Sequence, residues 1–276
     1  MALDVLRVAH LFAGCGGGML GSEILGHESI FAVEIEEVRC GVLRRRRDEG
    51  GWFGGCEIIR GDIRDVDATR WQGQLDCISA GFPCQDISVA GRGAGVEGSR
   101  SGLVREVFRI ADQARAPIVY LENSPAIRKR GRETIIKEFL ARGYAWKDGT
   151  LSAADVGAGH KRNRWWFIAA NADGIGKLES ERRKFEEWRR DSYGAGAAPD
   201  TYKGGCQAGD MAYLGRDEAQ TIYSACGFTG QESWWPVDAG IRGMVDGVPG
   251  KMDRIAMLGD SQVPLQAAVA WLLLIQ

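Results

Sequence analysis

The sequence has 276 residues, 45% of them hydrophobic, which is enough to bury the core of one large domain. Seven cysteines without paired spacing and only three histidines argue against a disulfide framework and against a zinc site. No apolar stretch approaches the roughly 20 residues that span a bilayer, and nothing resembles a signal peptide. We therefore expect a cytoplasmic protein without a metal and without a membrane anchor.

The net charge of −2 gives no overall sign of nucleic-acid binding, but the positive charge is clustered. Arginines and lysines gather at residues 44–47, 128–132, 160–164 and 182–190. Taken singly, such runs are typical of solvated helix faces. Together they are compatible with one basic face that pairs with phosphates.

Residues 6–12 predict a first strand, which runs directly into the glycine-rich turn 13–18 and then into a segment with helical spacing. Strand, glycine turn and helix form the arrangement that lets the backbone approach a nucleotide closely. A second predicted strand ends at Glu34, where a carboxylate can accept hydrogen bonds from ribose hydroxyls. A third ends at Asp62, which could accept from an adenine amino group. Two strand-end carboxylates after a glycine turn indicate an adenosine site.

A fourth predicted strand, residues 75–78, leads into Ser79–Gln85 and delivers Cys84 to the loop that follows. Open α/β sheets bind their ligands at these strand ends, and Pro83 stiffens the loop. An isolated cysteine is more typically a buried structural residue. Cys84 is therefore a nucleophile candidate only if the rest of the chain supplies a cofactor, an acid and a cation.

The later segments supply candidates for these groups. Residues 86–101 are rich in glycine and form either a surface loop or a lid over a large substrate. A predicted strand over 116–123 ends with Glu122, which is either the required acid or part of a helix cap. Arg162 and Arg164 alternate just before another predicted strand, so their guanidinium groups point to one side. Residues 171–240 show no clear period except around Leu178–Trp188 and predict a separate small lobe or an irregular insertion, whereas 263–275 predict an apolar helix.

In their order along the chain, these segments resemble the motifs of the DNA (cytosine-5-)methyltransferase family. Phe12–Gly17 resembles the motif that holds the methionine part of S-adenosylmethionine, Glu34 the ribose-binding acid, and Gly61–Ile63 the adenine-binding turn. Gly81–Gln85 matches the nucleophile motif without departure. Further similar segments are Arg100–Leu103, Glu122–Ser124 with Ser124 in place of valine, His160–Arg164 with His160 in place of glutamine, Arg242–Pro249, and Gly259–Val263 with Asp260 in place of asparagine.

The resemblance implies a role for each matched position. Cys84 would add to C6 of a flipped-out cytosine, Glu122 would protonate N3, Arg164 would hold O2, and Arg162 would support the site or a phosphate. Asp260 would either pair with the cofactor's ammonium group or repel its carboxylate. The implied cofactor-binding residues are Phe12, Ala13, Gly14, Gly16, Gly17, Glu34, Ile35, Asp62, Ile63, Pro83, Leu103, Asp260 and Ser261.

The implied fold is α/β, a Rossmann-like S-adenosylmethionine-dependent methyltransferase domain with a small, mostly irregular target-recognition lobe. Residues 1–170 would form the catalytic and cofactor-binding domain, 171–250 the lobe, and 251–276 a segment that packs back on the catalytic domain. The lobe is short for the family, which implies a short or relaxed recognition sequence or help from a partner. We expect a monomer that acts on double-stranded DNA, and a cognate restriction enzyme is a candidate partner.

Three other interpretations remain open at this point. An RNA (tRNA) cytosine-5 methyltransferase would use the same chemistry on the same fold. A catalytically inactive regulator that binds cytosine or DNA would be consistent with Asp260 and the small lobe. A dinucleotide oxidoreductase would explain the glycine turn and Glu34, but it would leave Cys84, Glu122 and Arg164 as coincidences.

Overall fold

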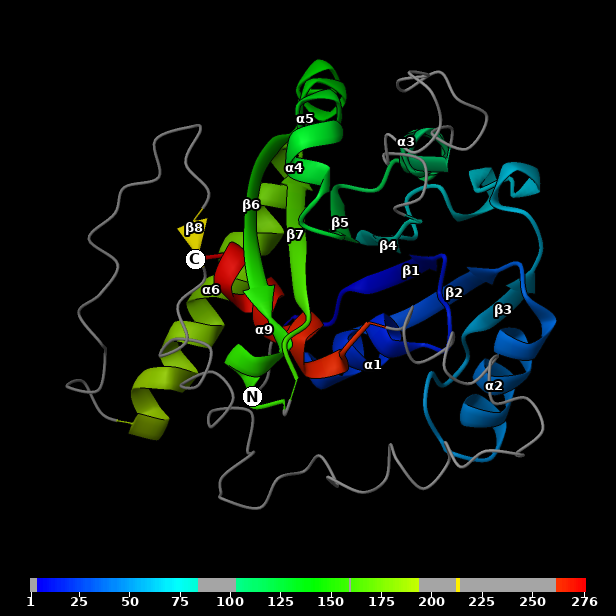
Figure 1. Cartoon of the computed structure of the whole chain (residues 1–276), viewed down its shortest axis with the longest axis horizontal. Helices are drawn as coiled ribbons and strands as arrows, with labels where there is room; N and C mark the ends of the chain where they lie inside the picture. The colour runs from blue at the N-terminus through cyan, green and yellow to red at the C-terminus, as the bar shows by residue number, and fades with distance from the viewer. Residues whose placement is uncertain (1–3, 84–102, 159, 194–211, 214–261) are drawn as a thin grey trace.

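A computed structural model describes residues 4–83, 103–158, 160–193, 212–213 and 262–276 (Figure 1). Cys84, Asp260 and Ser261, three of the predicted site residues, lie outside these ranges. None of the helices in the described ranges has the length and apolar content needed to span a membrane.

The described strands form one sheet in the order β3-β2-β1-β4-β5-β7-β6-β8. Strand β7 runs antiparallel to its neighbours β5 and β6, whereas the other paired strands are parallel. The strands are β1 (Arg7–Leu11), β2 (Glu28–Glu34), β3 (Glu57–Arg60), β4 (Cys77–Gly81), β5 (Ile118–Asn123), β6 (Ala145–Ser152), β7 (Asn163–Ala170) and β8 (Ala212–Tyr213).

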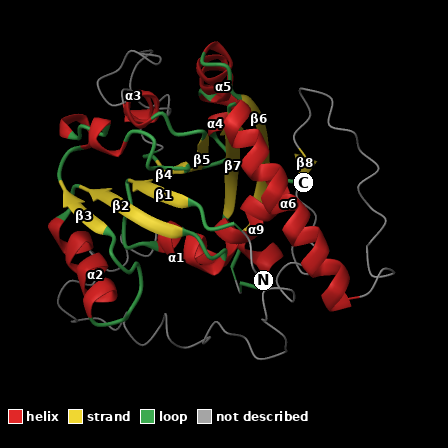
Figure 2. Ribbon diagram, turned by 180° about the vertical axis from the view of Figure 1, so that it is seen from behind, coloured by secondary structure: helices red, strands yellow, loops and turns green. Residues whose placement is uncertain are grey.

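Helices cover both faces of this sheet (Figure 2). They are α1 (Gly17–Ile24), α2 (Glu37–Asp48), α3 (Leu103–Ala114), α4 (Ile127–Arg130), α5 (Arg132–Ala141), α6 (Ala172–Tyr193) and α9 (Pro264–Leu274), with short 3-10 turns η1 (Ile63–Asp65), η2 (Thr69–Trp71) and η4 (Ala153–Val156).

Successive strand residues point to opposite faces, which divides the apolar core into two layers. On β5, Val119 and Leu121 pack in one layer with side chains of α3 and α5. Their neighbours Ile118 and Tyr120 pack in the other layer with α6 and α9. Because β5 is buried on both faces, its sequence is continuously apolar up to Glu122. The sheet order and the two helix layers confirm the predicted α/β, Rossmann-like class.

The strand order reverses between β1 and β4. From β1 the chain proceeds to β2 and β3 on one side and then returns to place β4 on the other side. Leu11 pairs with Val33 of β2 and with Ala80 of β4, so three strand ends meet at this point. Ligands of open α/β sheets bind in the crevice at such a reversal.

Helix α6 corrects the expectation of irregular structure after residue 170. It spans 22 residues, and its Phe185 packs in the same core layer as β7 and α9. Its Glu181 is fully buried, where it pairs with His27 Nε2 at 2.7 Å and accepts a hydrogen bond from Trp271 Nε1 at 2.8 Å. The periodicity noted around Leu178–Trp188 thus belongs to a helix that extends over residues 172–193. Residues 172–193 therefore pack with the first domain.

The last helix, α9, lies against α1 and the sheet. All its residues from Leu265 to Leu274 are buried, which explains why its sequence is apolar on every side. A Cβ atom added at Gly21 of α1 would lie 2.9 Å from the Cβ atom of Ala267, so glycine permits this close approach.

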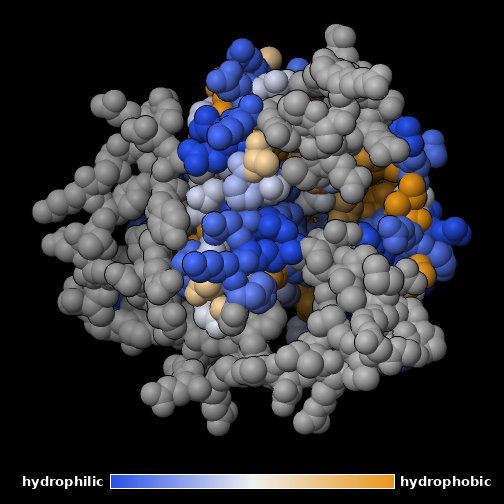
Figure 3. Space-filling view, in the orientation of Figure 1, coloured by the Kyte–Doolittle hydropathy of each residue, from blue (hydrophilic) through white to orange (hydrophobic). Residues whose placement is uncertain are grey.

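The surface is hydrophilic over the middle of the face drawn in Figure 3, and hydrophobic side chains gather on the side of β2 and β3. Three exposed hydrophobic residues, Ile35, Val38 and Trp52, come from the segments that adjoin these two strands. Ile35 directly follows β2, at the crevice described above.

Candidate active site

A cavity of about 420 Å³ opens at the carboxyl ends of β1, β2, β4 and β5. It is lined by His10, Leu11, Phe12, Ala13, Gly14, Gly18, Met19, Glu34, Ile35, Glu36, Arg39, Ser79, Gly81, Phe82, Pro83, Glu122, Asn123, Ser124, Arg162, Arg164 and Gln262.

One wall of the cavity is the glycine-rich turn between β1 and α1. Phe12, Gly14 and Gly16 have φ angles of 56°, 56° and 86°, in the left-handed region that glycine adopts most easily. The turn is held by hydrogen bonds from Ala13 N to the carbonyl of Val33 at 3.0 Å and from Gly16 N to the carbonyl of Ala13 at 2.9 Å. Between Phe12 and α1, its two glycines therefore bring the main chain close to the cavity.

Glu34 ends β2 beside this turn, and its side chain is buried. One carboxylate oxygen accepts from Gly14 N at 2.8 Å and the other from Glu36 N at 2.9 Å. Each oxygen retains acceptor capacity, so the fixed carboxylate can also receive hydroxyl hydrogen bonds from the cavity side. Ile35, 60% exposed, adds an apolar surface next to it. This combination fits a ribose with an attached base.

Asp62 and Ile63 do not line the cavity. The Asp62 carboxylate binds the Arg64 guanidinium, with Oδ1 2.9 Å from Nε and Oδ2 2.5 Å from Nη2. These hydrogen bonds lower the pKa of Asp62 to about 2. Ile63 is buried in the core. The turn nevertheless begins beside the cavity, because Gly61 N donates to the carbonyl of Glu34 at 3.1 Å.

Glu122 lies at the opposite end of the cavity, at the end of β5, and is 8% exposed. Its Oε1 is 2.7 Å from Nε of Arg164. Its Oε2 accepts a longer hydrogen bond, 3.4 Å, from the Gln262 amide. Burial raises the pKa of Glu122, and the neighbouring Arg164 guanidinium opposes this rise without cancelling it. A carboxyl group with a raised pKa can hold a proton at a ligand atom.

The end of β4 lies next to this acid. Gly81 pairs with Glu122 across the two parallel strands, and the Asn123 amide donates to the carbonyl of Phe82 at 3.0 Å. Pro83 lines the cavity. Cys84 is the next residue in the sequence, outside the described ranges.

The cavity brings together nine of the predicted site residues. Those that line it are Phe12, Ala13, Gly14, Glu34, Ile35, Pro83, Glu122, Arg162 and Arg164. Gly16 and Gly17 instead shape the start of α1: a Cβ atom at Gly17 would lie 2.0 Å from the carbonyl oxygen of Gln262. Leu103, the first residue of α3, packs against the core.

Gln262 is a site residue that sequence reasoning missed. Its main chain passes α1 so closely that Gly17 has no room for a side chain, and its amide fills the space beside Gly18. The same amide approaches Gly81 and donates to Glu122. In the sequence, Gln262 directly follows the predicted site residues Asp260 and Ser261, and this position could have indicated that it belongs to the site. The glycines that make room for it belong to other segments of the sequence.

Asn123 was also missed as a site residue, although it follows Glu122 and lines the cavity. Within the described ranges, no group of three or more His, Cys, Asp or Glu side chains is arranged to hold a metal ion.

Comparison with known proteins identifies one family. The family model described as C-5 cytosine-specific DNA methylase matches residues 6–203. The type II methyltransferase M.Eco47II of Escherichia coli is 33% identical over 180 residues, which cover 62% of this chain and 42% of the relative. M.HhaI of Haemophilus parahaemolyticus is 31% identical over 175 residues, or 62% of this chain and 51% of the relative. The chain thus spans about half the length of these relatives.

Among solved structures, a mutant DNMT2 of Spodoptera frugiperda superimposes with a TM-score of 0.51 at 19% identity, over 60% of this chain and 50% of that one. The S. pombe Dnmt2 methyltransferase gives a TM-score of 0.50 at 18% identity, over 64% and 56%. These likenesses show a shared fold and confirm the predicted Rossmann-like methyltransferase architecture.

Proposed function

Because the chain belongs to the C-5 cytosine-specific DNA methylase family, we propose that it transfers a methyl group to C5 of a flipped-out cytosine in DNA. One observation carries this proposal: a single cavity holds the glycine turn and Glu34 at one end and the Glu122–Arg164 pair at the other. The end with Glu34 would hold a methyl donor that carries a nucleoside, and the end with Glu122 and Arg164 would hold a pyrimidine ring.

Members of this family use S-adenosylmethionine as the methyl donor. Turn 12–14 would hold its methionine part, Glu34 its ribose hydroxyls, and Ile35 would contact its adenine. The buried Glu34 carboxylate fits this role, since two main-chain N–H groups fix it without using all its acceptor capacity. When bound, the cofactor supplies an electrophilic methyl group on its sulfonium sulfur.

Cys84 would activate the cytosine, whose C5 is a poor nucleophile. Its thiolate would add to C6, which breaks the C5–C6 double bond and makes C5 an enamine-like nucleophile. C5 would then attack the methyl group of the cofactor. A base then removes the C5 proton, the C5–C6 double bond forms again, and the C6–S bond breaks to release Cys84. Pro83, the preceding residue, lines the cavity and supports this placement.

Glu122 would hold a proton at N3 while Cys84 adds to C6. Burial raises the pKa of Glu122, which favours the protonated form that this step needs. Arg164 would bind the base oxygen O2 with N–H groups that its pairing with Glu122 leaves available, and Arg162 would support the site or a phosphate. The reaction requires a base outside the stack, and flipping it out costs a few kcal/mol.

The target-recognition lobe would begin after α6, at about residue 194, because α6 packs with the catalytic domain. We further propose that the protein acts as a monomer on double-stranded DNA. The relatives above are named type II methyltransferases, so a cognate restriction enzyme remains a candidate partner.

Nucleoside mass spectrometry of DNA and RNA from a host that expresses the full chain tests this proposal. We expect 5-methylcytosine in DNA, absent when Cys84→Ala is expressed instead. Its appearance only in tRNA would favour the RNA methyltransferase, and its absence from both would favour the inactive regulator. Bisulfite sequencing of the same DNA would then identify the recognition sequence.

A further inference from the structure

Two segments of the chain lie side by side at the edge of the sheet where the cavity opens. Asn123, the last residue of β5, pairs with Trp165 near the start of β7. The chain therefore leaves β5 and enters β7 at the same edge. Ser124 of the outgoing segment and Arg162 of the incoming one both line the cavity. Both segments thus form part of the cavity wall, at the end that holds Glu122.

Both segments are basic. Residues 123–132 contain four arginine or lysine residues and no acid, and residues 156–164 contain three and no acid. Among these cations, Arg128, Lys129 and Lys161 are exposed. No carboxylate of the described ranges forms an ion pair with any of these three side chains. Their charge can therefore act on a ligand that approaches from solvent.

The segment after β5 is held at both ends. Ile127 N donates to the carbonyl of Ser124 at 3.1 Å, and the Ile127 side chain is fully buried in the core. At the far end, Arg132 binds the buried carboxylate of Asp148, with Nη2 3.0 Å from Oδ1. The two exposed cations of α4 lie between these anchors. A tight helical turn rises about 2 Å per residue, which places them within roughly 10 Å of Ser124.

The segment before β7 is held by the last helix. The side chain of Gln266 on α9 is fully buried, and its amide donates to the carbonyl of Arg162 at 2.8 Å and to that of Leu151 at 2.7 Å. Ala153 N donates to the same carbonyl of Arg162 at 3.2 Å. Lys161 directly precedes this fixed residue, so its exposed side chain begins beside the cavity.

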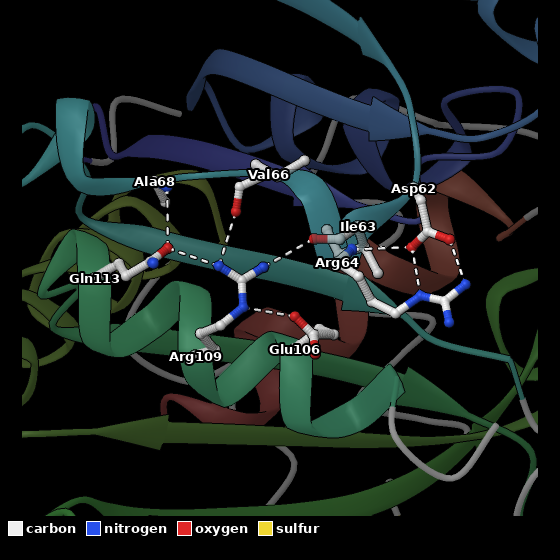
Figure 4. A network of polar contacts seen from close by, with 8 residues as sticks. All are labelled: Asp62, Ile63, Arg64, Val66, Ala68, Glu106, Arg109 and Gln113. Atoms are coloured by element: carbon white, nitrogen blue, oxygen red, sulfur yellow. Dashed lines mark hydrogen bonds and ion pairs between the residues drawn. The ribbon is translucent and has the colours of Figure 1, made fainter. Parts of the chain in front are cut away.

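Other arginines of the structure are bound by the protein itself, as Figure 4 shows for two of them. The Arg109 guanidinium donates to two main-chain carbonyl groups of residues 62–68, at 2.9 and 2.8 Å, and to Glu106 at 2.6 Å. The Arg64 guanidinium pairs with Asp62. Partners of this kind occupy the N–H donors of an arginine. The three exposed cations beside the cavity differ from these arginines, because no carboxylate of the described residues binds them.

We propose that Arg128, Lys129 and Lys161 bind phosphates of the DNA backbone beside the flipped-out base. Guanidinium and ammonium groups are typical donors to DNA phosphates. The chain has a net charge of −2 and does not attract DNA as a whole, so a local cluster of cations would orient the duplex across the mouth of the cavity. Phosphate contacts fix the register of the duplex but carry no base preference. This inference rests on the proposed function, since the duplex is its substrate.

The salt dependence of DNA binding tests the proposal, measured by titration of a fluorescent DNA duplex with the full chain. Each phosphate contact contributes about 0.9 to the slope of log K against log salt concentration. The variant Arg128→Gln/Lys129→Gln should therefore lower the magnitude of this slope by about 1.8, and Lys161→Gln by about 0.9. An unchanged slope in these variants, with a wild type that binds, would overturn the proposal. A wild type that binds no DNA would instead overturn the proposed function.

Arg115 and Lys137 provide a matched control. Both are exposed, and neither forms an ion pair with a carboxylate in the part of the chain that the structure describes. Arg115 lies three residues before β5, at the opposite edge of the sheet from the cavity. Arg115→Gln/Lys137→Gln removes the same charge as the first variant and should keep the wild-type slope. An equal fall in this control would assign the effect to net charge and overturn the specific surface.

Two further measurements separate phosphate binding from damage to the site. S-adenosyl-L-homocysteine should bind these variants as it binds the wild type, because none of the three side chains lines the cavity. In methyl transfer to plasmid DNA, KM should rise while kcat stays near the wild-type value, which is the pattern of lost uniform binding. A fall in kcat with an unchanged KM would overturn the phosphate role. Tighter binding of an RNA duplex of the same sequence would overturn DNA as the ligand of this surface.

Discussion

The Nε atom of Arg164 lies 2.7 Å from Oε1 of Glu122, although one residue comes from the start of β7 and the other from the end of β5. These strands are adjacent and antiparallel, so the start of one meets the end of the other. Burial raises the pKa of Glu122, and the cation limits the rise. The carboxyl group is thus poised to exchange a proton while it remains anchored.

Replacement of this acid tests its role at N3. Glu122→Gln keeps the shape of the side chain but cannot exchange the proton, so methyl transfer should slow by about 10²-fold or more. Binding of DNA and of S-adenosyl-L-homocysteine should remain, because neither depends on that proton. Single-turnover transfer of a labelled methyl group measures the rate. Glu138→Gln, at a half-buried position outside the cavity, serves as the control. A wild-type rate in Glu122→Gln would exclude proton transfer by Glu122.

The proposed nucleophile predicts a different pattern. Cys84→Ala should abolish methylation and leave S-adenosyl-L-homocysteine binding intact, because the variant loses the thiol that is proposed to bond to C6 and keeps the residues at the Glu34 end of the cavity. Cys56→Ala is a suitable control: burial raises the pKa of that thiol to about 12, which keeps it unreactive near neutral pH. Methylation assays and calorimetry on both variants decide the point, and measurable methylation by Cys84→Ala would disprove the covalent mechanism.

The sequence indicated those parts of the site that follow directly from strand ends. The glycine turn after the first strand and the carboxylates at the ends of two later strands are local patterns. Gly14, Glu34 and Glu122 could therefore be predicted to lie close together. The contact between Gln262 and Glu122 could not, because it joins segments 140 residues apart. Asp62 was predicted to bind the adenine because it follows a strand end. In the structure its carboxylate instead binds the guanidinium of Arg64, two residues away.

Helix α6 shows a second limit of sequence patterns. Its core-facing positions include Glu181, whose burial is tolerated because His27 and Trp271 satisfy both carboxylate oxygens. Those partners are distant in the sequence, so the residue looked like part of a solvated, charged segment. A buried polar network cannot be recognised until the partners are brought together.

His10 gives the fold a specific sensitivity to acid. Burial, with His27 nearby, lowers the pKa of His10 from 6.5 to about 3, and its Nε2 lies 3.1 Å from the Ser29 hydroxyl. Above pH 6.5 the ring is neutral in both the folded and the unfolded state. Below pH 6.5 only the unfolded state takes up the proton, so the free energy of unfolding should fall by up to about 1.4 kcal/mol per pH unit until pH approaches 3.

Urea denaturation of the wild type and of His10→Gln at pH 7.5 and 5.5 measures this contribution. Between pH 7.5 and pH 5.5, the free energy of unfolding of the wild type should fall by about 1 kcal/mol more than that of the variant, because the two proteins share all other titrating groups. Equal losses in both proteins would mean that the folded state protonates His10 as readily as the unfolded chain does.

Gly81 tests the packing that holds Gln262 against the acid. A Cβ atom at this position would lie 2.7 Å from Gln262 Nε2 and 3.0 Å from Glu122 Oε2. Gly81→Ala should therefore displace both side chains and break their hydrogen bond, at a cost of about 1–3 kcal/mol in the free energy of unfolding.

The displacement should also slow methyl transfer, since Glu122 would no longer lie where the base needs its proton. We expect a fall of about tenfold in kcat, the effect of losing one well-oriented hydrogen bond. Gly41→Ala in α2 is the matched control, because a Cβ atom there has no neighbour within 4 Å. It should stabilise the protein by about 0.5–1 kcal/mol and keep the wild-type kcat. If Gly81→Ala also kept that rate, the position of Glu122 would not depend on this contact.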